Sequence, residues 1–118
     1  MYRVIVTGGR EYSDRAKVNE VLDDLLFKHR LLVIIEGGCR PRGADHLAAK
    51  WAEAMLPEDQ HETHFANWTE YGKMAGHLRN FHMASLGANL CIAFPGGRGT
   101  EDMKRQARKY GIRVREIK

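Results

Sequence analysis

The sequence has few cysteines, few prolines and no long apolar run. Its 118 residues include two cysteines, Cys39 and Cys91, and three prolines. One cysteine falls in an expected turn and the other in an apolar strand, so neither a disulfide framework nor a zinc-type pair is predicted, and a reducing compartment fits best. No apolar run approaches the ~20 residues that span a bilayer, and no secretion signal opens the chain. We expect a cytoplasmic protein with no membrane partner.

Two familiar nucleotide motifs and the usual metal-ligand patterns are also missing. The Gly8-Gly9 turn lacks the third glycine of the dinucleotide fingerprint, and no stretch reads Gly-x4-Gly-Lys-Ser/Thr. Hydride transfer and nucleotide triphosphate hydrolysis are therefore disfavoured, and no cofactor is expected. His77 and His82 are five residues apart and do not share a helix face, while His61 and His64 alternate across a strand. No metal site is predicted.

The composition is that of one compact domain over residues 1–118, with 43% hydrophobic and 29% charged residues. Five apolar runs predict strands, at residues 2–7, 31–36, 61–66, 88–94 and 112–117. Between them, amphipathic patterns predict four helices, one capped by Ser13 and closed by His29 and Arg30, the others at residues 43–56, 70–86 and 100–110. Strict alternation implies parallel strands with right-handed crossovers. We expect an α/β fold, a three-layer Rossmann-like sandwich around a five-stranded, mainly parallel sheet.

Three glycine-bearing turns follow the first, second and fourth expected strands, at the sheet edge where such folds bind ligands. Glycines let the backbone approach a ligand closely, and the free N–H groups that open a helix point toward negative charge. We therefore expect the turns to converge on one anion site. The predicted ligand-binding residues are Gly8, Gly9 and Arg10 after the first strand, Gly37, Gly38 and Asp45 after the second, and Pro95, Gly96, Gly97, Arg98, Gly99 and Thr100 after the fourth.

Most of the polar candidates have a structural alternative. The Thr100 hydroxyl either caps the last helix or binds phosphate, and the Arg98 guanidinium either forms a phosphate fork or points into water. Asp45 either accepts hydrogen bonds from ribose hydroxyls or stabilises a positive helix end. Arg79 lies near the apolar face of the third helix, which favours a position in the crevice.

The aromatic residues divide into a ligand candidate and packing residues. Trp68 flanks the start of the third helix, where an aromatic ring can stack on a base. Trp51 lies within the second helix and is expected to pack in the core. Along the third helix we expect one buried stripe made of Tyr71, Met74, Ala75 and Leu78.

Together these motifs resemble the SLOG superfamily over nearly the whole chain. They are Val6-Thr7-Gly8-Gly9-Arg10, Gly37-Gly38 with Gly43-Ala44-Asp45, the segment 68–73, Arg79-Asn80 and the segment 95–100. The sequence is most similar to the small stand-alone YspA-like SLOG proteins of bacteria and phages, with the Lonely Guy phosphoribohydrolases as better-understood relatives. The resemblance implies a Rossmann-like fold that binds a nucleotide or nucleotide-derived ligand. Some members hydrolyse the N-glycosidic bond of nucleoside monophosphates, others sense a ligand, and a DNA-processing branch binds single strands.

The chain departs from the hydrolase relatives at two positions. Those relatives carry an Arg-Lys pair and a glutamate three residues after the motif threonine, whereas this chain has Arg79-Asn80 and Met103. A thioether neither stabilises a cation nor moves a proton at neutral pH. By this resemblance the catalytic candidates are Arg79 with Glu101 or Asp102, whose alternative role is to complement the helix dipole.

We therefore expect a nucleotide-binding protein, with hydrolysis of an N-glycosidic bond as the activity of its relatives and a non-catalytic sensor as the alternative. A single-stranded nucleic acid is a second alternative partner, because the net charge is +4 and the last helix carries a basic stripe. The stripe consists of Lys104, Arg105, Arg108 and Lys109, and its structural alternative is a solvated face. The relatives commonly dimerise through helices beside the site, so the resemblance also implies a homo-oligomer.

Overall fold

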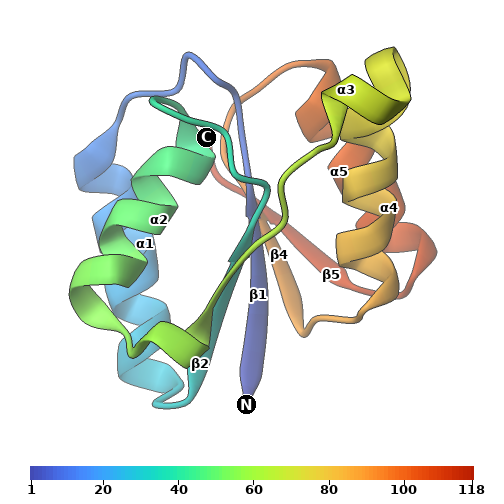
Figure 1. The fold of residues 1–118 in the computed structure, drawn as a ribbon. Coiled ribbons are helices and arrows are strands. Elements are labelled where there is room, and N and C mark those ends of the chain that lie inside the picture. The colour runs from blue at the N-terminus through green and yellow to red at the C-terminus, as the bar shows by residue number, and fades with distance from the viewer.

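The computed structural model describes residues 1–118 and shows a five-stranded sheet between two pairs of helices (Figure 1). The strands lie in the order β3-β2-β1-β4-β5, and every neighbouring pair is parallel. The predicted Rossmann-like α/β fold is confirmed. The strands are β1 (Tyr2–Thr7), β2 (Leu32–Glu36), β3 (His61–Thr63), β4 (Leu90–Ala93) and β5 (Arg113–Glu116).

Four main helices cover the two faces of the sheet. In Figure 1, α1 (Arg15–Lys28) and α2 (Ala44–Met55) lie on one side, and α4 (Ala75–Ser85) and α5 (Arg98–Lys109) lie on the other. A single turn, α3 (Trp68–Tyr71), sits at the end of α4, and short 3-10 helices occupy Glu58–Gln60 and Gly72–Met74. None of the helices is long and apolar enough to cross a membrane.

The central strand β1 supplies side chains to both halves of the core. Val4 and Val6 pack in the cluster formed with α1 and α2, which also holds the predicted core residue Trp51. Ile5 belongs to the cluster formed with α4 and α5. Successive side chains of a strand point to opposite faces, and a strand covered on both faces is therefore apolar throughout. The chain winds outward from β1 in both directions, so the carboxyl ends of β1 and β4 meet where the winding reverses.

The starts of α1 and α5 differ from the expected ones. The cap of α1 is Asp14 and not Ser13, because the Asp14 side chain accepts a hydrogen bond from the Lys17 N–H at 3.0 Å. Helix α5 begins two residues earlier than expected, with Gly97 as its N-cap and no capping side chain. Thr100 is therefore not the cap. The first turn of α5 keeps backbone N–H groups that no side chain satisfies.

The third predicted helix is broken, and its expected buried stripe is wrong. Gly72 adopts a φ of +54°, which interrupts the helix between α3 and α4. Glycine reaches this left-handed region without the steric penalty that other residues meet. Only one of the four stripe residues is buried, because α4 turns a different face to the core, formed by Ala75, Asn80, Met83 and Ala84. Ala75 faces the core, whereas the large side chains of Tyr71, Met74 and Leu78 are exposed.

Candidate functional site

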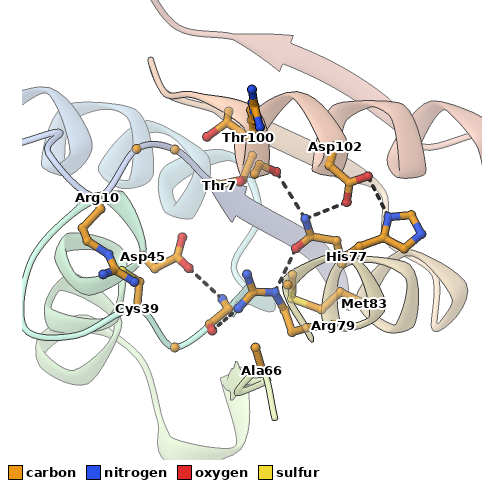
Figure 2. Close-up of a pocket in the computed structure, with 18 of the residues that line it drawn as sticks. Thr7, Arg10, Cys39, Asp45, Ala66, His77, Arg79, Met83, Thr100 and Asp102 are labelled. Carbon is orange, nitrogen blue, oxygen red and sulfur yellow. Dashed lines mark hydrogen bonds and ion pairs between the residues drawn. The ribbon is translucent and has the colours of Figure 1, made fainter. Parts of the chain in front are cut away.

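A cavity of about 820 Å³ opens at the carboxyl ends of the strands (Figure 2). The three glycine-bearing turns meet there, as the sequence predicts, together with the start of α3 and one side of α4. Two predicted ligand residues, Pro95 and Gly96, are not part of the cavity wall. The predicted residues that line it are Gly8, Gly9, Arg10, Gly37, Gly38, Asp45, Trp68, Arg79, Gly97, Arg98, Gly99 and Thr100.

The first and third turns touch each other through glycines. The Gly9 N–H donates to the Pro95 carbonyl at 2.9 Å. A Cβ atom on Gly9 would come within 3.0 Å of the Gly96 Cα, and one on Gly8 within 2.5 Å of the Ala44 Cβ. Pro95 and Gly96 therefore bring the turns together, and the residues that follow them form the cavity wall.

The amino end of α5 presents free backbone donors to the cavity. Glu101 is the first residue of this helix whose N–H finds a helical partner, the Gly97 carbonyl at 3.0 Å. A Cβ atom on Gly97 or Gly99 would meet no heavy atom within 4 Å, and both glycines line the cavity. Open space thus adjoins the N–H groups and the positive end of the helix dipole, which is the arrangement that binds a phosphate or carboxylate.

The wall of the cavity is predominantly basic. The wall includes two carboxylates, those of Asp45 and Asp102. It includes six cationic side chains, those of Arg10, Arg40, Lys73, Arg79, Arg98 and Arg105. The structure has no group of three or more His, Cys, Asp or Glu side chains that could hold a metal ion. The positive charge therefore comes from side chains and from the helix end, and it suits an anionic ligand.

Arg79 is held in the cavity wall by the second turn. Its Nη1 donates to the Gly37 carbonyl and its Nε to the Asn80 Oδ1 at 2.8 Å (Figure 2). A side chain on Gly37 would overlap the guanidinium and approach the Asp45 Oδ2. The glycine at position 37 therefore provides the room in which this arginine lies. The Nη2 atom makes no hydrogen bond within the protein and remains available to a ligand.

Asn80 connects the two helices at the cavity, a role that the sequence did not indicate. This buried amide donates through Nδ2 to the Asp102 Oδ2 at 3.0 Å and to the Gly99 carbonyl at 3.2 Å, while its Oδ1 accepts from Arg79. One side chain thus orients Arg79, Asp102 and the first turn of α5. By the resemblance, Asn80 stands at the position where the hydrolase relatives have a lysine. In this chain its amide links α4 to the first turn of α5.

The two candidate carboxylates of α5 occupy different environments. Asp102 lines the cavity and accepts a hydrogen bond from the His77 Nδ1 at 2.9 Å (Figure 2), whereas Glu101 lies outside and pairs with the Lys104 Nζ at 2.6 Å. Burial tends to raise the pKa of Asp102, but hydrogen bonds from His77 and Asn80 outweigh it and lower this pKa. Met103 is fully buried in the core. Of the two α5 carboxylates, only Asp102 faces the cavity.

Asp45 lies across the cavity in an environment that raises its pKa. Its Oδ2 accepts from the Gly37 N–H at 3.2 Å. Burial raises the pKa of Asp45 to about 6, although the nearby Arg79 guanidinium opposes the rise, and the Glu36 charge adds to it. Asp45 thus changes protonation near neutral pH while Asp102 stays ionised. A neutral carboxyl can donate a hydrogen bond as well as accept one, which suits contact with ribose hydroxyls.

Aromatic rings stand at the mouth of the cavity. The ring of Trp68 packs over Gly76, where a Cβ atom would come within 3.3 Å of the Trp68 Cη2, and more than half of this side chain is exposed. Phe65 lies against Gly38 and is 69% exposed. A base can stack on either ring. The sequence pattern indicated Trp68 but not Phe65.

A buried carboxylate, Glu36, lies beneath the second turn, and the sequence pattern did not indicate its role. Glu36 is the last residue of β2 and is fully buried. It accepts hydrogen bonds from the Gly38 N–H at 2.8 Å and from the His61 Nε2 at 2.9 Å. The Thr63 hydroxyl donates to it at 2.5 Å and the Arg40 Nη1 at 3.1 Å. Burial alone would raise the pKa of Glu36, but these hydrogen bonds lower it to about 2. The detectable signal was a charged residue at the end of an otherwise apolar strand.

The fold and cavity define a parallel α/β protein with an uncapped helix end and converging glycine turns at the point where the sheet winding reverses. The chain belongs to the YspA, cpYpsA-related SLOG family, whose model matches residues 2–71. It is also similar to the Gene 61 protein of Mycobacterium phage D29, with 44% identity over 120 aligned residues that cover 97% of this chain and 94% of the phage protein. No solved structure is significantly similar to it.

Proposed function

We propose that this protein binds a nucleotide or nucleotide-derived ligand, with a phosphate on the first turn of α5 and the nucleoside extending toward Gly8, Gly9 and Trp68. The observation that carries the proposal is the free amino end of α5 facing the cavity, beside Gly97 and Gly99. Backbone N–H groups and the helix dipole favour a phosphate there. Membership of the SLOG family supports a nucleotide-related ligand.

Changing Gly99 to aspartate should weaken phosphate binding without harming the fold. The new side chain enters open space, and a carboxylate in the first turn of a helix is favourable for helix stability. The same charge repels a phosphate on the α5 amides, so affinity should fall by about tenfold or more. Calorimetric titration with AMP, GMP, CMP and UMP measures the change, and thermal unfolding shows that Gly99→Asp is folded.

The matched control is Gly99→Ala, which adds bulk at the same position without charge. Alanine is the better helix former, so this variant should be at least as stable as the wild type. Its affinity should fall less than that of Gly99→Asp. Wild-type affinity in Gly99→Asp would show that the phosphate does not bind at this helix end.

A second candidate function is hydrolysis of the N-glycosidic bond of a bound nucleoside monophosphate, which the position of Asp102 favours. The C1′–N bond breaks, and its electron pair leaves with the base, which gains a proton. Water supplies the oxygen that bonds to C1′ and releases that proton. The Asp102 carboxylate stabilises the positive charge that develops on the ribose, and Arg79 with the α5 amides holds the 5′-phosphate. The alternative is a sensor that binds without turnover.

The hydrolase proposal is tested by incubating the protein with nucleoside monophosphates and measuring the rate of free-base release by mass spectrometry. Asp102→Asn keeps the shape of the side chain but loses its charge, so the rate should fall by about a hundredfold. Glu101→Gln is the matched control, because Glu101 lies outside the cavity, and it should leave the rate unchanged. Saturable binding with no base release from any nucleotide would favour the sensor instead.

A single-stranded nucleic acid is the less favoured partner in this proposal. Three residues of the basic stripe on α5 are paired with carboxylates within the protein. Lys104 contacts Glu101 and Glu116, Arg105 contacts Asp102, and Arg108 contacts Glu116, which leaves only Lys109 without an ion pair. Side chains already neutralised in this way have less charge to offer phosphates. A nucleic-acid complex would lose affinity steeply with added salt.

A second copy of this chain is the proposed macromolecular partner. Met74, Leu78 and Phe81 lie at i, i+4 and i+7 spacing and are all exposed, and the Phe81 ring packs against Tyr110 with centroids 5.9 Å apart. An exposed apolar stripe of this kind suits a symmetric contact between identical subunits. Light scattering should then give twice the 13.5 kDa chain mass.

A further inference from the structure

A second cavity, of about 560 Å³, adjoins the first along α4. It lies between the chain segment that follows β3 and the helices α3 and α4. The residues of its wall that could contact a ligand are His64, Phe65, Tyr71, Arg79 and His82. The ligand position proposed above leaves this cavity empty, because a mononucleotide with its phosphate on α5 and its base at Trp68 has no group left to fill it.

The two cavities share two lining residues, Phe65 and Arg79. Arg79 is the only lining residue of the second cavity that is always charged, and it stands where the two cavities join. Its Nε and Nη1 are held by Asn80 and Gly37, so the remaining Nη2 donors can bind an anionic group at the junction. Together with the α5 amides, this arginine provides a second anion contact in one continuous site.

Four of the nine residues that line the second cavity carry aromatic rings. The rings of His64 and His82 meet edge to face with centroids 5.3 Å apart. The His64 Nε2 is oriented by the Glu62 Oε1 at 3.1 Å, whereas the His82 ring makes no hydrogen bond within the protein. Tyr71 exposes about half of its surface beside them. Stacking faces combined with a free ring nitrogen suit a heteroaromatic base, which presents both a π-face and polar edges.

We infer that the second cavity is a second base subsite, and that the ligand is a dinucleotide whose two nucleosides are joined through a pyrophosphate. This inference rests on the proposed function. One phosphate lies on the α5 amides, and the other reaches Arg79 at the junction. The first base stacks at Trp68, and the second occupies the space between Tyr71 and His82. The dinucleotide is bound outside the usual fingerprint, because the chain lacks the third glycine of that motif.

Calorimetric titration with AMP, ADP-ribose and P1,P2-diadenosine diphosphate, and in parallel with the guanosine counterparts, tests this inference. ADP-ribose carries the pyrophosphate and the second ribose but no second base. Diadenosine diphosphate, or its guanosine counterpart, should bind about tenfold more tightly than the ligand that lacks the second base. Tyr71→Ala and His82→Ala should each remove most of this gain and leave the affinity for ADP-ribose within about twofold.

The control variant is Phe27→Ala, which removes an 80% exposed aromatic ring on α1 that lines neither cavity. It should change no affinity, and thermal unfolding should show that all three variants fold. Equal binding of ADP-ribose and the dinucleotide, or equal losses for both ligands in Tyr71→Ala and His82→Ala, would overturn the second subsite and leave nucleotide binding standing. Failure of every probe to bind, together with failure of AMP, GMP, CMP and UMP in the titration described above, would overturn the proposed function itself and this inference with it.

Discussion

Replacing Glu36 with alanine should lower the free energy of unfolding by about 3–5 kcal/mol, because it removes the centre of a buried polar cluster. The Thr63 hydroxyl and the His61 ring would lose their shared acceptor, and the Gly38 N–H would lose its partner. Arg40 is partly exposed and can turn toward water, so its own contribution is smaller. Urea unfolding at pH 7 measures the loss.

The effect should depend on pH in a defined direction. The pKa of Glu36 is lowered in the folded protein to about 2, from a usual value of 4.5. The folded state therefore binds fewer protons than the unfolded state between these values, and the stabilisation is complete above pH 4.5 and lost as the pH falls toward 2. The difference between the wild type and Glu36→Ala should shrink over that interval.

Glu62 is the matched control for Glu36. It lies on the neighbouring strand β3 and pairs with Arg3 at 2.5 Å. Both side chains are partly exposed, Glu62 to 33% and Arg3 to 28%. Water can replace this partner, so Glu62→Ala should cost about 1 kcal/mol or less. Equal losses in the two alanine variants would contradict the view that burial makes Glu36 important. Glu36→Ala should also weaken ligand binding, because the turn that Glu36 holds forms part of the cavity wall.

Replacing Gly96 with alanine should lower the free energy of unfolding by about 3 kcal/mol, since the two turns at the sheet edge have no room for a methyl group. The new Cβ atom would lie 2.6 Å from the Gly9 nitrogen and would overlap the Thr100 hydroxyl. The hydroxyl belongs to a buried side chain, and the nitrogen belongs to a backbone that donates to Pro95. Relief therefore requires the first and third turns to separate.

Urea unfolding of Gly96→Ala beside Gly99→Ala gives the sharpest comparison. The two glycines lie three residues apart in the same motif, but a Cβ atom on Gly99 meets nothing within 4 Å. Gly99→Ala should be neutral or stabilising by up to about 1 kcal/mol, because alanine favours the helix. A Gly96→Ala variant as stable as the wild type would mean that the turns are not in close contact.

The sequence predicted the parallel sheet well because the inner strands β2 and β4 are buried and mostly apolar, and because amphipathic helices separate successive strands. The expected strand over residues 2–7 appears at those bounds as β1. The prediction failed where one residue changed the backbone direction. Gly72 lies inside an otherwise helical pattern, and a single glycine there is compatible with a continuous helix or with a break.

The glycine turns and their place at the carboxyl edge were also readable from the sequence, because parallel topology brings the ends of all strands to one side. Which of two neighbouring residues faces the cavity and which faces the core could not be predicted from the sequence. Asp102 and Met103 are adjacent in the chain, yet one faces the cavity and the other the core. A shift of one residue along the helix decides between these environments, and the start of α5 was misplaced by two residues.

The sequence by itself determined the alternation of strands and helices along the chain, the glycine-bearing turns and the sheet edge at which these turns gather. These features follow from local periodicity and from the few ways in which alternating strands and helices can pack. Only the tertiary structure decided which side chains meet. Arg79 lies 42 residues from Gly37 in the chain, and Glu36 lies 25 residues from His61. Contacts over such separations depend on the packing of whole helices against the sheet, and no local pattern encodes that packing.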